Sequence, residues 1–461
     1  MSSIESIFQV QNKLRSELGL HKVKAIPNPN YERNGVKSYV YLLSRYGFQP
    51  TQPGPYFHKK TIHQRGLVNS KVAQGGRLRF HSELVKRTSG SDAASGHKEV
   101  TAEDQQNDSM YICEVQIGTP AQTLKLDFDT GSSDLWVFST STQVVGKGQS
   151  GKISGHNAFD PRKSSTWKDS AHQAWQISYG DGSTASGTVG TDVVSIGGLK
   201  IQKQSIEMAS QLSSQFAQGS SDGLLGLAFP SINTITSNGR ADPQPTPVAN
   251  MIRQGDIPKN TELFTSAFYS SKDKAADSFY TFGFIDQDLV KASGKDIVWT
   301  DIDNSQGFWM FASTSATING KKVTRDNNTA IADTGTTLAL VSDDVCEALY
   351  GAIKGATYSE EQQGWLIPTS VTAADLPNFS LAVGDTEFTI QKEDLLFAAA
   401  DDKNWYGGVQ SRGENPFDIL GDTFLKSIYA IWDQGNNRFG AVPKIEPTQN
   451  IDPPTSDSYG N

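Results

Sequence analysis

The sequence predicts a mostly β protein built from two related lobes, and three features carry that prediction. From about residue 109 onward, short β-type runs alternate with Gly, Ser, Asn and Asp. An Asp-Thr-Gly segment occurs twice, each time after an apolar run, and a basic segment precedes both copies. Gly contributes 42 of the 461 residues and charged residues 20%, which is closer to a loop-rich β protein than to a helical bundle.

The basic segment comes first in the chain. Residues 1–87 hold 15 Lys and Arg but 4 Asp and Glu, a balance of +11, whereas the remainder holds 26 and 46, a balance of −20. Such an asymmetry usually marks an interaction arm. A nucleic-acid-binding tail is one interpretation, but the basic residues are scattered and the acidic remainder is an available partner. We therefore favour an intramolecular latch over nucleic-acid binding.

The segment boundaries follow from composition. Lys86-Arg87 ends the basic arm, and a small, polar stretch that cannot bury a core follows it, as expected of an exposed linker with a processing site. We divide the chain into the basic arm, a linker, a first lobe, a second lobe and a polar tail. Their limits are 1–87, 88–107, 108–297, 298–446 and 447–461.

The β-type runs give the expected strands, and one window has helical periodicity. The helix is expected at Asp343–Ile353. The strands are expected at Tyr111–Ile117, Thr123–Phe128, Gln173–Tyr179, Thr188–Ile196, Ser266–Tyr269, Phe279–Phe284 and Ile428–Trp432. Apolar stretches such as Leu224–Phe229 are far shorter than the roughly 20 residues that span a bilayer, so we expect no membrane segment.

The repeat is the strongest signal. Its copies are Leu126–Ser133, with Asp129-Thr-Gly, and Ala330–Thr337, with Asp333-Thr-Gly. An apolar-Gly element follows each copy, at Asp222–Ala228 and at Phe417–Asp422. This arrangement suggests that each lobe has one Asp loop and one apolar strand crossing behind it.

A single Asp-Thr-Gly is an ordinary turn, but two copies in matched apolar settings point to a pair of carboxylates. Two adjacent carboxylates cannot both ionise cheaply, so they share a proton. One then acts as a base toward water while the other polarises a carbonyl. This chemistry requires no metal and no cofactor. Cys113 and Cys346 permit at most one disulfide, and the Cys and His spacings of a zinc site are absent.

These residues resemble the pepsin family of aspartic proteases, most closely its fungal members. The match runs from about Ser109 to Pro443, and Gly35–Tyr46 in the basic arm is similar to fungal propeptides. The motifs are Asp129–Val137, Tyr179–Ser183, Asp222–Ala228 and Asp333–Thr337. The resemblance implies a bilobal pepsin-like acid protease fold with a deep cleft between two related lobes.

The resemblance also implies roles for single residues around the catalytic Asp129 and Asp333. Ser132 and Thr336 would donate to the outer oxygens of the two carboxylates, and the backbone would stay close to them at Gly131 and Gly335. Tyr179, Gly180 and Asp181 would form the tip of a flap, backed by Trp136. Asp127 and Asp181, with Phe216 as an apolar wall, would line a pocket that accepts Lys. Taken singly, Trp136 and Tyr179 are more simply core aromatics.

The sequence thus predicts an aspartic endopeptidase that acts on peptides or proteins, made as a proenzyme whose own basic propeptide blocks the site until acid pH. As in related zymogens, a Lys of the arm is expected at the two aspartates, with Lys37, Lys59 and Lys60 as candidates. An inactive pepsin-like binding protein, or a protease dedicated to one pathway, is the alternative. We expect a monomer.

Two features bear on location and redox state. The family suggests a secreted or vacuolar protein, yet the start of the chain shows no signal peptide. Relatives commonly have a disulfide in the second lobe, with one half near Trp365–Ser370, where this chain has no Cys. We therefore expect Cys113 and Cys346 to be separate buried thiols.

Overall fold

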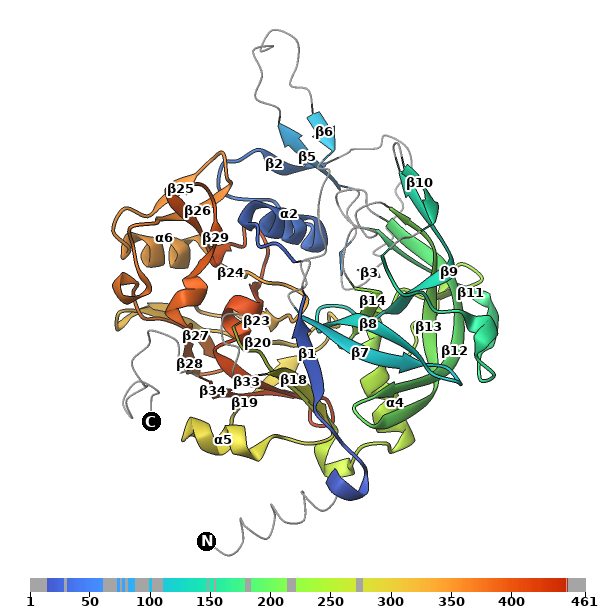
Figure 1. Ribbon diagram of the computed structural model, residues 1–461. Helices are drawn as coiled ribbons and strands as arrows, with labels where there is room; N and C mark the ends of the chain where they lie inside the picture. Colours follow the sequence, from blue (N-terminus) through green and yellow to red (C-terminus); the bar gives the residue numbers. More distant parts are fainter. Residues whose placement is uncertain are drawn as a thin grey trace, which may run out of the picture.

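The computed structural model describes residues 15–28, 31–60, 73–74, 77–78, 82–87, 99–101, 111–146, 149–152, 155–178, 184–213, 221–270, 277–444 and 446. Strands dominate these residues, and they form two lobes side by side (Figure 1). The first lobe is teal to green in Figure 1 and the second is orange to red, while the blue helix α2 lies at the top between them. The predicted mostly β, two-lobed fold is confirmed.

The first lobe is built around long antiparallel hairpins. Its strands are β7 (Tyr111–Ile117), β8 (Gln122–Asp129), β9 (Leu135–Gly146), β10 (Gln149–Lys152), β11 (Lys168–Ser178), β12 (Thr184–Ile196), β13 (Leu199–Ser213), β14 (Gly223–Gly226), β15 (Thr236–Ser237) and β16 (Arg240–Ala241). Its helices are η1 (Pro161–Lys163), η2 (Pro230–Ile232), α4 (Pro247–Gln254) and η3 (Lys259–Thr261). Gly197 and Gly198 both have positive φ and form the tight turn that joins β12 to β13.

The second lobe contains more and shorter strands. They are β20 (Met310–Ala312), β21 (Ser315–Ile318), β22 (Lys321–Thr324), β23 (Thr329–Ala332), β24 (Ala339–Val341), β25 (Thr357–Ser359), β26 (Gly364–Pro368), β27 (Phe379–Val383), β28 (Thr386–Thr389), β29 (Leu396–Ala399), β30 (Asn404–Gly407), β31 (Val409–Ser411) and β32 (Asp418–Leu420). The helices are α6 (Asp343–Gly351), η4 (Ala373–Asp375), η5 (Lys392–Leu395) and α7 (Asp422–Leu425).

A sheet shared by both lobes lies beneath them. Its strands run in the order β1 (Val23–Pro27), β18 (Ser278–Phe282), β17 (Leu263–Ala267), β33 (Ile428–Asp433), β34 (Arg438–Pro443) and β19 (Val298–Asp303), all antiparallel. Helix α5 (Gln287–Ser293) precedes β19. The predicted division of the lobes at residues 297 and 298 therefore falls just before a strand of the shared sheet.

The basic arm is part of this architecture. Its β1 pairs with β18 on one side and with β7 on the other, so it joins the shared sheet to the first lobe. Its other elements are α2 (Gly35–Tyr46), β2 (Tyr56–Lys60), β3 (Ala73–Gln74), β4 (Arg77–Leu78), β5 (Ser82–Arg87) and β6 (Glu99–Thr101). The composition of the arm gave no indication that it would supply a strand to the main sheet.

Helix α2 has well-defined ends and an apolar face. The Asn34 side chain caps its first turn by accepting from the Lys37 N–H, and Gly47, at φ 67°, ends it in the left-handed conformation. Buried Tyr39, Val40, Leu42 and Leu43 pack into one cluster with apolar residues of the second lobe, such as Leu340 and Tyr406. The arm is therefore docked through a hydrophobic contact as well as through charge.

The predicted elements agree with the structure within a few residues. β7 has the predicted bounds, the expected helix is α6, and the strand expected at Ser266–Tyr269 is β17, displaced toward the N-terminus. Cys113 and Cys346 are free and buried, as predicted. Among the described helices, none is both long and apolar enough to cross a membrane.

Candidate active site

Asp129 ends a buried strand at the centre of the first lobe. Its strand β8 lies parallel to β14, and Gly226 of β14 is opposite Asp129. β14 also pairs antiparallel with β9, so it crosses directly behind the Asp129 loop. The Leu227 N–H donates to the main-chain oxygen of Asp129 at 2.8 Å and fixes the end of β8. This is the predicted apolar strand behind the first loop.

Asp333 occupies the equivalent position in the second lobe. Its loop follows β23, which lies parallel to β32, and β32 pairs antiparallel with β24. The Asp333 N–H donates to the main-chain oxygen of Leu420 at 3.0 Å. The two lobes therefore repeat one local topology, as the sequence repeat indicated.

Two threonines join the loops across the lobe boundary. The Thr130 N–H donates to Thr334 Oγ1 at 3.1 Å, and the Thr334 N–H donates to Thr130 Oγ1 at 3.0 Å. Each hydroxyl then donates to a main-chain oxygen of the opposite loop, Thr130 to Ala332 and Thr334 to Phe128. These reciprocal bonds hold Asp129 and Asp333 side by side.

The main chain and one hydroxyl orient the carboxylates. The Gly131 N–H donates to Asp129 Oδ1 at 2.8 Å, and the Ser132 hydroxyl donates to Asp129 Oδ2 at 2.6 Å. The Gly335 N–H donates to Asp333 Oδ1 at 3.0 Å. The roles expected of Gly131, Ser132 and Gly335 agree with this geometry. Thr336 differs, because its hydroxyl donates to the main-chain oxygen of Asp333 at 3.2 Å rather than to the carboxylate.

The two glycines leave room for the carboxylates. A Cβ atom at Gly131 would lie 2.7 Å from Asp333 Oδ1, and a Cβ at Gly335 would lie 2.3 Å from Asp129 Oδ1. Both distances are well below van der Waals contact. Any larger residue at either position would therefore push the two carboxylates apart.

Arg45 of the basic arm lies directly on the pair. Its Nη2 donates to Asp129 Oδ1 at 2.7 Å and to Oδ2 at 2.8 Å, and lies 3.6 Å from Asp333 Oδ2. Its Nη1 donates to the Gly335 oxygen at 3.0 Å and to the Tyr41 hydroxyl at 3.1 Å. Arg45 is 1% exposed, and both aspartates are 0% exposed. This is a buried, charge-assisted pair with several donors in place.

Tyr46, the next residue, contacts the second carboxylate. Its hydroxyl donates to Asp333 Oδ2 at 2.5 Å, and its ring packs against Phe308 and Phe417 at centroid distances of 6.1 and 6.4 Å. The last turn of α2 thus supplies one donor group to each aspartate.

The two carboxyls have different proton affinities. Burial alone would raise the pKa of Asp129, but the Arg45 charge and the hydrogen bonds that this carboxylate accepts hold its pKa below the ordinary value. Burial raises the pKa of Asp333 to about 7; Arg45 opposes the shift and the neighbouring Asp129 adds to it. The pair therefore holds one proton on Asp333 and one negative charge on Asp129 over a wide pH range.

The basic residue of the arm that contacts the pair is an arginine and not the expected lysine. The cation is Arg45, whereas Lys37 lies in the first turn of α2, at the opposite end of the helix. Lys59 and Lys60 belong to β2, and their side chains lie outside the described residues.

The remaining predicted site residues are only partly placed. Trp136 is buried and stacks on Trp175 at 6.1 Å. Asp127 is 3% exposed, two residues before Asp129 on β8, and after burial it is the group that raises the pKa of the Cys113 thiol. Neither observation tests a role in a substrate pocket. The other four predicted residues, Tyr179, Gly180, Asp181 and Phe216, lie outside the described residues.

Sequence reasoning missed four residues that contact or join the aspartates. Thr130 and Thr334 had a visible signal, because each is the second residue of an Asp-Thr-Gly copy. Arg45 and Tyr46 also had one, because they end the apolar stretch Gly35–Tyr46 just before Gly47.

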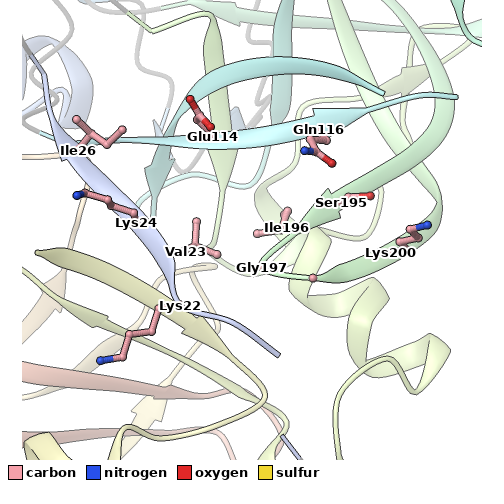
Figure 2. A pocket seen from close by; sticks show the side chains of 11 residues that line it. Lys22, Val23, Lys24, Ile26, Glu114, Gln116, Ser195, Ile196, Gly197 and Lys200 are labelled. Atoms are coloured by element: carbon pink, nitrogen blue, oxygen red, sulfur yellow. The ribbon is translucent and has the colours of Figure 1, made fainter. Parts of the chain in front are cut away.

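An open pocket lies elsewhere, along the exposed side of β1. Its volume is about 440 Å³, and Figure 2 shows Lys24 of β1, Glu114 of β7 and Lys200 of β13 among its lining residues. The aspartates are not part of this pocket, since α2 covers them. Within the described part of the chain, no three His, Cys, Asp or Glu side chains are grouped as they would be around a metal ion.

Comparisons with known proteins agree with this geometry. A family model described as eukaryotic aspartyl protease matches residues 110–444. The chain is 40% identical over 379 residues to aspergillopepsin-1 of Aspergillus pseudoglaucus, covering 82% of this chain and 89% of the relative. It is 38% identical to penicillopepsin-1 of Talaromyces stipitatus, covering 78% and 85%, and 34% identical to endothiapepsin of Cryphonectria parasitica, covering 90% and 88%.

Proposed function

The chain belongs to the eukaryotic aspartyl protease family and is an aspartic endopeptidase, and we propose that the described form is its inactive proenzyme, which acid activates. The observation that carries this proposal is the buried contact of Arg45 with both oxygens of Asp129. A substrate carbonyl and the attacking water need the space that the Arg45 guanidinium and the Tyr46 hydroxyl fill.

Once the arm has left, the two aspartates can carry out the hydrolysis. Aspartic proteases are the standard example of a carboxyl pair that shares one proton. Asp129, the more acidic member, accepts a proton from the attacking water, while the protonated Asp333 donates to the substrate carbonyl oxygen. The Gly131 and Gly335 N–H groups keep the two carboxylates oriented during this exchange. With Arg45 gone, the Gly131 N–H and the Ser132 hydroxyl still favour the charged form of Asp129, which is the form that this step requires.

Acid would release the arm through the carboxylates, since Arg45 stays charged at any physiological pH. The depressed pKa of Asp129 means that its ion pair is intact above the ordinary carboxyl range and is lost as the pH falls through the depressed value. Protonation of Asp129 would therefore weaken the arm at its contact with the pair. Two lysines near the start of β1 also form ion pairs. Lys22, just before β1, pairs with Asp286, and Lys24, in β1, pairs with Asp277.

The substrate preference is also a proposal. We infer that Asp181 and Asp127 supply carboxylates near the pocket for the residue on the acyl side of the scissile bond, with Phe216 as an apolar wall. Such a pocket would take Lys through a charge-assisted bond and would take large apolar residues through contact with Phe216. The support is the resemblance of the flap motif to that of fungal relatives.

One experiment tests the activity and its control by the arm. The full-length protein is incubated from pH 3 to pH 7 with an unstructured protein substrate, with and without a statine-type transition-state mimic. Mass spectrometry follows both the substrate and the chain itself. We expect no cleavage at neutral pH, and at acid pH we expect shortening of the chain near Lys86-Arg87 together with inhibitor-sensitive cleavage. Full activity of the intact chain at pH 7 would refute the latch, and no cleavage at any pH would refute the function.

A further inference from the structure

A second pair of carboxyls lies behind the first catalytic loop. Asp134 and Glu207 are 0% and 1% exposed, and both carboxyls accept from the same amide group. Asn233 bridges them, since its Nδ2 donates to Asp134 Oδ1 at 2.9 Å and to Glu207 Oε1 at 3.0 Å. The Thr234 N–H also donates to Asp134 Oδ1, at 2.7 Å.

Two buried carboxyls that share one amide donor cannot both ionise cheaply. Ionised carboxylates only accept hydrogen bonds, so a proton on one of the two groups removes the repulsion between them. Burial, and then the charge of Asp134, raise the pKa of Glu207 well above its ordinary value, while Asn233 opposes the shift. The same physics that places one proton on the catalytic pair applies here.

The charges around Glu207 support a single shared proton. Glu207 lies on β13, where its neighbours on the adjacent strands are Val189 of β12 and Trp136 of β9. Neither side chain carries a charge. The loop after η2 contributes the neutral Asn233 and Thr234. Within the described part of the chain, Asp134 is the acidic group whose charge raises the pKa of Glu207. No cation there lowers it.

This pair is connected to the catalytic loop through Asn233 and the main chain. Asn233 Nδ2 also donates to the main-chain oxygen of Ser133 at 3.3 Å. The Gly226 N–H donates to the main-chain oxygen of Asp134 at 2.8 Å. Ser133 directly follows Ser132, whose hydroxyl holds Asp129. The bridged carboxyls therefore fix the C-terminal end of the loop that orients the catalytic aspartate.

We propose that Asp134 and Glu207 are positioning residues that share one proton, and that loss of this proton as the pH rises loosens the Asp129 loop and sets the upper pH limit of the active first lobe. The repulsion of two buried negative charges would act against the bridge at Asn233. A raised folded-state pKa contributes stability that is complete below the unfolded value and is lost as the pH rises through the folded value. The contribution of Glu207 to stability is therefore lost as the pH rises, whereas that of the Arg45–Asp129 ion pair is lost as the pH falls.

The test compares full-length proteins that all carry Asp333→Asn, so that none can cut itself. Urea unfolding is measured from pH 5 to pH 8 for this parent and for the same protein with Glu207→Gln. The amide mimics the protonated acid and does not titrate. It should therefore remove much of the loss of stability that the parent shows as the pH rises. We expect the unfolding constants of the two proteins to diverge by about tenfold for each unit of pKa difference between the folded and unfolded states. Parallel curves would overturn the proposal.

Two further variants sharpen this test. Asp134→Asn removes the other acid and should flatten the pH dependence as well, even at a lower overall stability. Asp256→Asn is the control, since Asp256 is a half-buried carboxyl of the same lobe whose pKa is raised by burial without an acidic partner. Asp256→Asn should keep most of the pH dependence of unfolding that the parent shows. If neither amide variant of the pair folds at pH 5, the shared proton is refuted, because an amide reproduces the neutral form.

The activity profile gives a second readout, which rests on the proposed proteolysis. In the activated enzyme with an intact catalytic pair, Glu207→Gln should leave kcat/KM at acid pH within about twofold and move the alkaline limb of the profile to higher pH. A residue with a merely structural role would lower activity at all pH values. An unchanged alkaline limb would contradict the link to Asp129, whereas the unfolding result would stand independently of any activity.

Discussion

Removal of the Arg45 charge should raise the pH at which the proenzyme activates. In Arg45→Leu the two oxygens of Asp129 lose the guanidinium, and a buried carboxylate is left with the Gly131 and Ser132 donors. Burial, which is the largest influence on this group, then raises the pKa of Asp129 with no cation to oppose it. Docking of the arm at neutral pH becomes weaker, and the pair takes up its second proton at a higher pH.

The size of the shift follows from the burial of the pair. Breaking a buried ion pair by removing one partner typically costs about 3–5 kcal/mol. One pKa unit corresponds to about 1.4 kcal/mol, so a loss near 3 kcal/mol moves the activation midpoint by about two pH units if release takes up one proton. If release takes up two protons in one step, the shift is about one pH unit.

The assay is a pH series on freshly prepared full-length protein. Chain mass is read by mass spectrometry, and activity is read with a fluorogenic peptide in the same samples. The midpoint of chain shortening should move up by about one to two pH units in Arg45→Leu. The kcat/KM of the shortened enzyme should equal that of wild type, because Arg45 belongs to the removed arm.

Two variants serve as controls for this shift. Arg45→Lys keeps the charge but loses the planar guanidinium, whose Nη2 contacts both Asp129 oxygens while Nη1 donates to the Gly335 main-chain oxygen. Its midpoint should therefore lie between those of wild type and Arg45→Leu. Lys37→Met removes a cation from the other end of α2 and should leave the midpoint unchanged. The reasoning fails if Arg45→Leu activates at the wild-type pH, or if Lys37→Met shifts the midpoint as much.

Other substitutions test the catalytic pair, the loop contacts and the flap. Asp129→Asn or Asp333→Asn should lower kcat by several orders of magnitude with the fold kept by circular dichroism, and wild-type-like turnover would refute the mechanism. Thr334→Val removes the hydroxyl that donates to the Phe128 oxygen and should lower the free energy of unfolding by about 1–3 kcal/mol; no change would show that these bonds add little. Asp181→Ser should depress cleavage after Lys by about tenfold or more relative to cleavage after Phe, and equal losses on both peptides would contradict a charge-selective role.

The fold and the catalytic pair could be predicted because their signals are local and repeated. Each Asp-Thr-Gly copy combines an apolar strand, a glycine that allows close approach and a short polar run, and the structure repeats this unit in both lobes. The apolar-Gly elements predicted the strands β14 and β32 that cross behind the loops. A pattern that the chain contains twice can be recognised without knowing where the copies meet.

Apart from Thr130 and Thr334, which stand in the repeated motif itself, the residues that were wrong or missed depend on contacts distant in sequence. The balance of charge predicted a cation from the arm but could not select among 15 of them, and Arg45 is placed by the docking of α2 on the second lobe. The Thr336 hydroxyl donates to the Asp333 main-chain oxygen, whereas the Asp333 carboxylate accepts from Tyr46 of the distant arm. Glu207 meets Asp134 through the register of β13 against β9, which no local pattern specifies.

The two carboxyl pairs respond to pH with opposite signs, and together they define when the chain can act. The Arg45–Asp129 ion pair holds the arm in place above the depressed pKa of Asp129 and is lost below it. The shared proton proposed for Asp134 and Glu207 is present at acid pH and is lost as the pH rises through the raised pKa of Glu207. In the proposed proenzyme the site is closed at neutral pH, and the strand β1 lies between β7 and β18, where it supports the first lobe. Once the arm is removed that support would be gone, so a rise in pH would act on a lobe that depends on the proton of its second carboxyl pair. Acid would therefore both open the site and stabilise the loop that carries Asp129, which confines proteolysis to acid conditions from both directions.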